Sequence, residues 1–247
     1  MKRPKPEKRF YRERIKKEGF TSFELIVGES DVWISIPKNF KSLIKEIKPL
    51  LIDYLVSLRT QIFLYGQNHE RFFTSLTPIE VDIVAPKIVK EMALASKKAF
   101  VGPMAGVAGA INKFLGEKLK EFGISEFIIE NGGDVYFSSS SEIVSSLIFG
   151  DPKLDGKLAI VVPKGSFGIC SSSSKIGHSL SLGRTHLATT IAKCPILADC
   201  CATFLGNSQD EEDFIERCKK ITDIYGALGF LNGKFVIFGE VRLVKVS

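Results

Sequence analysis

Apolar residues recur along the chain with the periods of helices and strands, and the pattern predicts a mixture of both. Residues 39–65 and residues 88–99 place apolar side chains on one face at helical spacing. Residues 22–36 have the pattern of apolar and polar residues typical of two strands on either side of Gly28-Glu29-Ser30-Asp31. This pattern predicts a hairpin. Asn232-Gly233, a dipeptide typical of two-residue turns, divides another pair of strands. Further strand-like segments are residues 157–163, 176–183, 186–193 and 229–246.

Two more helices are predicted where glycine or proline marks the ends of an apolar pattern. Residues 100–123 begin with a Gly- and Ala-rich half, in which Pro103 suits the first helical position. Gly106 and Gly109 each cost a helix about 1 kcal/mol relative to Ala. We therefore expect a strand or a ligand to pack closely against them, and packing on a sheet is the simpler explanation. Residues 195–207 predict a helix that starts with proline and stops at a glycine.

These elements predict an α+β fold in a single domain, with mixed β-sheets packed with helices. A chain of 247 residues can bury a substantial core, and no linker or repeat divides it. The net charge of +6 comes from residues 1–20, which hold nine Lys or Arg and three Glu. We expect a basic arm over residues 1–20 and one domain over residues 21–247. The balanced charge of that domain predicts no face for nucleic acid.

Other classes of protein are excluded by what the sequence lacks. No run approaches the roughly 18 apolar residues of a membrane helix, so a membrane partner is not expected. The charged N-terminus is not followed by the apolar segment of a secretory signal. Five cysteines without a CxxC motif predict buried free thiols rather than disulfides. We therefore expect a cytoplasmic protein.

The run EFIIENGGDVYF, residues 126–137, breaks an apolar neighbourhood with two glycines and two carboxylates. Paired glycines allow positive φ angles and the close approach of a ligand, while Asn and Asp offer oxygens suited to Mg²⁺. Asn131, Gly132, Gly133 and Asp134 are therefore candidate binding residues. By themselves these residues favour a plain β-turn slightly over a binding site, because all three residue types favour turns.

Residues 168–183 form a second candidate, in which hydroxyl-bearing and small residues predict a loop that presents donors to phosphate. Lys175 could add positive charge, and His178 could act as a general acid or base. A solvent-exposed serine loop explains the same residues. Both serine runs of the chain, residues 138–141 and 171–174, are predicted to lie in loops.

Asp199 and Thr203 form the third candidate, because they stand four residues apart on the helix predicted for residues 195–207. That spacing puts a carboxylate and a hydroxyl on one face, one turn apart. The two could serve as ligands of Mg²⁺, with water and phosphate completing the set. The simpler alternative is a threonine that bonds its own helix and an aspartate near the helix N-terminus.

The candidate segments together resemble a family of archaeal and bacterial proteins related to the ApbE flavin transferases. The resemblance extends from about Phe10 to Gly206 and implies an ApbE-like fold. ApbE enzymes bind FAD with Mg²⁺ and transfer FMN to a threonine or serine of a target protein, releasing AMP. The implied cofactors are Mg²⁺ and FAD or a related nucleotide. The segments that carry the resemblance are residues 101–111, 130–134, 168–183 and 196–207.

The resemblance also implies metal and pocket residues. ApbE proteins take metal ligands from a D-x-x-x-T helix, which Asp199 and Thr203 match in type and spacing. Their N-x-GG-[DN] loop is similar to residues 131–134, with one residue fewer here. Their T-S-G element near the flavin is similar to Ser171-Ser172-Ser173.

On the same basis Ser171, Ser172 and Lys175 would contact phosphates, and His178 would be the catalytic base. The chain departs from ApbE in two places. No Asp-Pro follows His178, and the N-terminal Met-Gly-Thr segment has no counterpart.

The expected partners are a flavin nucleotide and an acceptor protein, and a homodimer stays open. The resemblance offers an alternative function, because relatives of this type are linked to sulfur assimilation. In that case the chain would be a non-catalytic accessory protein that handles sulfur through Cys170.

Overall fold

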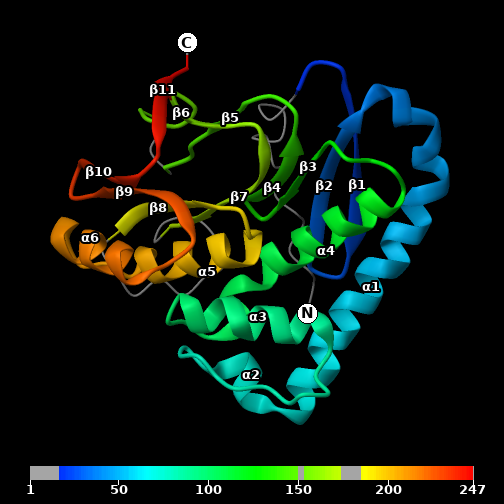
Figure 1. The fold of residues 1–247 in the computed structure, drawn as a ribbon, viewed down its shortest axis with the longest axis horizontal. Helices are drawn as coiled ribbons and strands as arrows, with labels where there is room; N and C mark the ends of the chain where they lie inside the picture. Colours follow the sequence, from blue (N-terminus) through cyan, green and yellow to red (C-terminus); the bar gives the residue numbers. More distant parts are fainter. Residues whose placement is uncertain (1–16, 150–152, 174–184, 247) are drawn as a thin grey trace.

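The computed structural model describes residues 17–149, 153–173 and 185–246, and these form two β-sheets and a layer of helices (Figure 1). The larger sheet has eight strands in the order β1-β2-β3-β4-β7-β8-β9-β10, and the smaller has the order β11-β6-β5. All of the strand pairs in the described residues are antiparallel. The strands are β1 (Phe20–Val27), β2 (Ser30–Pro37), β3 (Phe127–Asn131), β4 (Asp134–Ser139), β5 (Ile143–Ser146), β6 (Leu158–Val162), β7 (Gly165–Ser172), β8 (Thr185–Ala192), β9 (Ile224–Leu231), β10 (Lys234–Gly239) and β11 (Arg242–Lys245).

Helices cover one face of the eight-stranded sheet, and the three-stranded sheet covers the other (Figure 1). The larger hydrophobic core lies between that sheet and the helices, and a smaller one lies between the two sheets. The predicted α+β class is confirmed. The helices are η2 (Lys38–Leu43), α1 (Ile44–Asn68), α2 (Glu70–Thr74), α3 (Lys87–Lys98), η3 (Pro103–Gly106), α4 (Val107–Glu121), α5 (Pro195–Gly206) and α6 (Glu211–Lys220).

The hairpins form where the sequence predicts them. Between β3 and β4, Gly132 and Gly133 have φ angles of +70° and +104°, which side-chain-bearing residues rarely adopt. Asn131 pairs directly with Asp134 across this two-residue turn. Asn232-Gly233 makes the same kind of connection between β9 and β10. Residues 131–134 therefore form a turn between two strands, whether or not they also bind a ligand.

Two of the sequence predictions differ from the structure. The helix expected over residues 39–65 begins as the short 3₁₀ segment η2, and α1 then continues to Asn68. The serine runs do not lie wholly in loops, because β4 contains Ser138–Ser139 and β7 contains Ser171–Ser172. Hydrogen bonds to neighbouring strands hold these serines in the sheet. The strand predicted for residues 176–183 lies outside the described residues.

Gly106 and Gly109 pack against helix α5 and not on a strand, which was the simpler expectation. A Cβ atom on Gly109 would lie 2.3 Å from the carbonyl oxygen of Pro195, and one on Gly106 would lie 2.7 Å from Cys200 Sγ. Glycine is therefore required because two helices cross with their backbones almost in contact. This crossing brings the first turn of α4 next to α5, and it places the candidate site.

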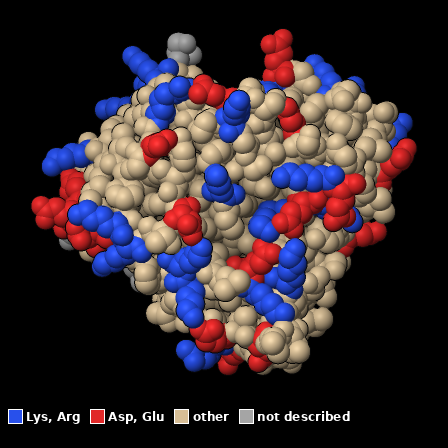
Figure 2. All heavy atoms as spheres, viewed as in Figure 1, with Lys and Arg blue, Asp and Glu red and all other residues tan. Residues whose placement is uncertain are grey.

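The surface in Figure 2 shows Lys and Arg interspersed with Asp and Glu. Several of these charges pair with each other, as Lys113 does with Glu91 at 2.9 Å. Within the described residues, no helix combines the length and the apolar composition needed to cross a membrane.

Candidate functional site

A buried carboxylate stabilises the turn of the β3–β4 hairpin. Glu130 is fully buried at the end of β3, and its Oε1 accepts a hydrogen bond of 2.7 Å from the backbone N–H of Gly133. The bond satisfies a donor of the turn, so Glu130 stabilises the hairpin. Cβ atoms built on Gly132 and Gly133 would meet no atom within 4 Å. The backbone of the turn therefore borders open space that a ligand could enter.

Asp134 joins this hairpin to two other elements. Its Oδ1 accepts a hydrogen bond of 3.1 Å from the backbone N–H of Ser171 in β7. Its carbonyl oxygen accepts a hydrogen bond of 2.9 Å from Nδ2 of Asn112 in α4. The side chain and the backbone of Asp134 are thus fixed separately, by the neighbouring strand and by the helix above it.

Asp199 reaches the same place from α5. Its Oδ2 accepts a hydrogen bond of 2.8 Å from the backbone N–H of Gly109, and the N–H of Ala108 also bonds this carboxylate. These N–H groups lie in the first turn of α4, where they have no partner within the helix and favour a negative charge. The close crossing at Gly109 therefore allows Asp199 to cap α4.

Asp134 and Asp199 form a pair of interacting carboxylates, in which Asp199 is buried and Asp134 is half-buried. Burial raises the pKa of Asp134 well above its usual value, the negative charge of Asp199 raises it further, and the Ser171 N–H lowers it. Burial likewise raises the pKa of Asp199 to about 7, against the lowering effect of the Gly109 and Ala108 N–H groups. Among the described residues, no Lys or Arg forms an ion pair with either carboxylate. A bound cation would offset the cost of bringing the two charges together.

The donor set around this pair suits Mg²⁺ in its chemistry. Carboxylate, hydroxyl and amide oxygens are the ligands that this hard cation takes, usually with water and phosphate. Thr203 is half-buried and lies one turn after Asp199 in α5, as the sequence predicts. In the described part of the chain, no three His, Cys, Asp or Glu side chains form a metal-binding group. A metal held here would therefore need ligands of other kinds besides the two carboxylates.

The structure separates the two serines that were expected to contact phosphate together. Neighbouring side chains of a strand point to opposite faces, so Ser171 and Ser172 diverge. The Ser171 hydroxyl bonds the Thr189 hydroxyl at 2.8 Å, whereas the Ser172 side chain is buried on the helix-covered face. Ser171 approaches the carboxylates through its backbone N–H alone. Lys175 and His178 lie outside the described residues.

Cys170 lies beside the two carboxylates but is a poor nucleophile. The residue is fully buried in β7, and its Sγ lies 3.6 Å from the carbonyl oxygen of Pro195. Burial raises the pKa of the thiol well above its usual value, and the charges of Asp134 and Asp199 raise it further. Because the thiolate is the reactive form, this environment does not favour sulfur chemistry at Cys170.

Asn112 is a site residue that the sequence analysis missed. It is fully buried in α4 among apolar neighbours such as Ile111 and Leu115. A polar residue in the middle of the apolar face of residues 107–121 was the available signal, since buried amides need partners.

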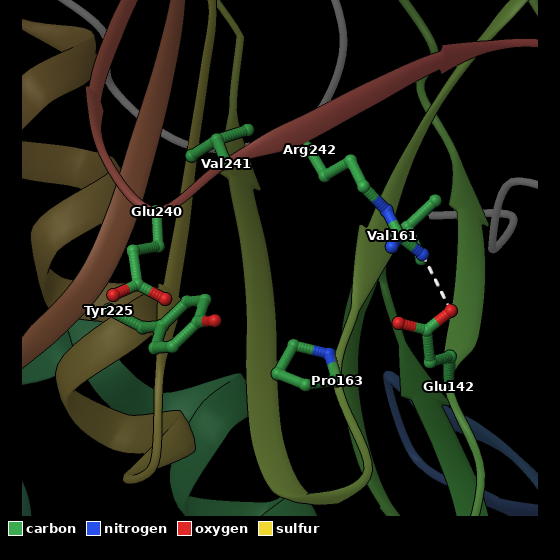
Figure 3. Close-up of a pocket in the computed structure, with 7 residues that line it drawn as sticks. All are labelled: Glu142, Val161, Pro163, Tyr225, Glu240, Val241 and Arg242. Carbon is green, nitrogen blue, oxygen red and sulfur yellow. Dashed lines mark hydrogen bonds and ion pairs between the residues drawn. The ribbon is translucent and has the colours of Figure 1, made fainter.

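A different hollow, of about 320 Å³, lies on the other side of the eight-stranded sheet (Figure 3). Its charged groups satisfy one another: Arg242 pairs with Glu142 at 2.5 Å, and Glu240 accepts a hydrogen bond from Tyr225. That bond raises the pKa of the Tyr225 phenol. The hollow contains none of the predicted site residues.

Comparisons with known proteins give the family and the fold. A family model described as AbpE bacteria matches residues 12–223. The UPF0280 protein of Methanococcus aeolicus is 36% identical over 189 residues, which cover 74% of this chain and 75% of that protein. The UPF0280 protein of Methanocaldococcus jannaschii is 31% identical over 235 residues, covering 90% of this chain and 93% of that protein.

Solved structures of the same fold are more distant in sequence. The ApbE protein of Thermotoga maritima matches with a TM-score of 0.53 and 12% identity, covering 90% of this chain and 96% of that one. The flavin transferase ApbE of Vibrio cholerae matches with a TM-score of 0.50 and 12% identity, covering 89% and 96%. Identity at this level shows a shared fold alone, and the predicted ApbE-like fold is confirmed.

Proposed function

The chain belongs to the AbpE bacteria family, and on this premise we propose that it binds a flavin nucleotide with Mg²⁺ and transfers FMN from FAD to a protein hydroxyl. One observation carries the proposal. Asp134 and Asp199, from a hairpin and a helix far apart in sequence, lie close enough for their charges to interact, and neither has a basic partner among the described residues. Such an arrangement is costly unless a cation joins it.

In this proposal Asp199 and Thr203 hold Mg²⁺, and Asp134 faces them from the hairpin. Asn131, Gly132 and Gly133 form the wall of the nucleotide pocket, where the backbone of the turn borders open space. Mg²⁺ would supply charge neutralisation at the pyrophosphate of FAD.

The protein residues position the reactants. Ser171, Ser172 and Lys175 would bind phosphate oxygens, and His178 would take the proton from the attacking hydroxyl. The acceptor oxygen would form a bond to the phosphorus of the FMN half, and the bond between that phosphorus and the bridging oxygen would break. AMP leaves with the bridging oxygen, so positioning and charge neutralisation account for most of the catalysis.

The test is incubation of the protein with FAD, Mg²⁺ and an extract that contains acceptor proteins. We expect AMP release and a flavin-fluorescent protein band that survives denaturation. Asp199→Asn should reduce both signals at least about 100-fold, because the substitution keeps the shape but removes a charged ligand.

Asp82→Asn is the matched control, since Asp82 is an exposed carboxylate that pairs with His69 away from the site. It should behave as the unmodified protein. Absence of both products with the unmodified protein, or full product formation by Asp199→Asn, would reject the proposal.

A further inference from the structure

We propose that Asn112 supplies a further protein oxygen to the cation site of Asp134, Asp199 and Thr203, an inference that rests on the proposed function. The starting point is an unsatisfied atom. Asn112 is fully buried, and its Oδ1 has no hydrogen-bond partner among the described residues. A buried amide oxygen without a partner is costly, so its retention in a core helix points to something that it binds.

The orientation of the amide group is fixed by its other end. Nδ2 donates to the carbonyl oxygen of Asp134 at 2.9 Å, and only the NH₂ group can make that bond. Oδ1 is therefore the atom left without a donor. The amide as a whole lies against the residue that provides one of the two carboxylates.

The helix geometry directs the same amide towards the other carboxylate. Asn112 follows Gly109 by three residues, so the two lie on one side of α4. Helical side chains lean towards the N-terminus of their helix and cover the preceding turn. That turn contains the Gly109 N–H that binds Asp199. Asn112 thus lies next to the turn that binds Asp199, while its amide is held against Asp134.

An amide oxygen is the kind of ligand that Asp134 and Asp199 need beside them to bind a cation. Neither a basic side chain nor a third carboxylate completes the pair in the described residues. An amide oxygen carries no net charge, so it adds a ligand without adding repulsion between like charges. Hard divalent cations accept amide oxygens beside carboxylates.

The experiment measures binding of Mn²⁺ alone, as a spectroscopic substitute for Mg²⁺, from the electron paramagnetic resonance signal of free Mn²⁺. Asn112→Leu conserves the approximate volume and removes both polar atoms. We expect its affinity for Mn²⁺ to fall about 10- to 100-fold. Asn112→Asp retains an oxygen at the same place, and it should bind Mn²⁺ at least as tightly as the unmodified protein.

Ser208→Ala is the matched control, because Ser208 is also fully buried with an unpartnered side-chain oxygen, but it lies after α5. It should leave Mn²⁺ affinity unchanged. Thermal melting without metal checks that each variant folds.

Three results would overturn the inference: no binding of Mn²⁺ by the unmodified protein, full affinity in Asn112→Leu, or equal losses in Asn112→Leu and Asn112→Asp. Equal losses would show that Asn112 acts only by holding the hairpin. Failure of the proposed function looks different, because Mn²⁺ binding would still depend on Asn112 while no flavin is bound or transferred.

Discussion

The two faces of the eight-stranded sheet place their carboxylates in opposite environments. On the helix-covered face, Asp199 is buried and Asp134 is half-buried, and the charge of Asp199 raises the cost of ionising Asp134. On the face covered by the small sheet, Glu142 and Glu240 stay at the rim of a hollow with Arg242 and Tyr225 as partners (Figure 3). Exposed pairs of this kind contribute little to stability and cost little. The interacting pair of Asp134 and Asp199 requires an explanation beyond folding, and a bound cation provides one.

The largest effect should come from glycines that allow close packing on each face. Gly109→Ala would place a Cβ atom 2.3 Å from the Pro195 carbonyl oxygen, and neither backbone can move freely. We expect a loss of about 3 kcal/mol in the free energy of unfolding. Gly226→Ala on the other side meets Val241 Cγ2 at 2.7 Å and two backbone oxygens at 3.1 Å. Because its shortest contact is with a side chain and is longer, we expect a smaller loss of about 2 kcal/mol. Urea denaturation of both variants measures the difference, and equal losses would contradict it.

The next prediction compares the substitution of one carboxylate on each face of the sheet. At pH 8 without metal, Asp199→Asn should raise the free energy of unfolding by about 1 kcal/mol or more, because it removes a buried charge and keeps an acceptor for Gly109. Glu142→Gln, on the other face, should change it by less than about 0.5 kcal/mol. A destabilised Asp199→Asn variant would show that the capping charge outweighs the cost of burial.

A pH titration gives a smaller effect of defined sign. The pKa of Asp199 is about 7 in the folded chain and near 4 when unfolded, so the folded state holds more protons between these values. Without metal, stability should therefore fall as pH rises from about 4 to about 7 and then level off. Mg²⁺ displaces the proton, so Mg²⁺ affinity should rise by up to about tenfold per pH unit over the same range. Calorimetry at several pH values measures the stability and the Mg²⁺ affinity. Both should depend less on pH in the Asp199→Asn variant.

The sequence predicted the elements whose signals are local. The turn at residues 131–134 follows from two glycines that need positive φ angles, and α5 begins at Pro195 and ends at Gly206 as expected. The approach of Asp199 to residues 131–134 was inferred only through a family resemblance. No local pattern encodes it, because it depends on a helix crossing.

The sequence was less informative where a residue's position depends on a distant partner. Packing on a sheet was the simpler expectation for Gly109, but its neighbour is the start of α5. Ser171 and Ser172 were expected in a loop, but they belong to β7, where strand alternation turns their side chains apart. The role of Asn112 was not predicted, because the sequence does not show which buried polar atoms lack a hydrogen-bond donor.

The central claim is that a flavin nucleotide binds at the carboxylate pair of Asp134 and Asp199 only together with Mg²⁺. The most direct measurement is a titration of FAD, followed by flavin fluorescence, with Mg²⁺ or with a chelator present, for the unmodified protein and for Asp199→Asn. We predict saturable binding that requires both Mg²⁺ and Asp199. Binding of equal strength in the presence of chelator, or no binding by the unmodified protein with Mg²⁺, would contradict it.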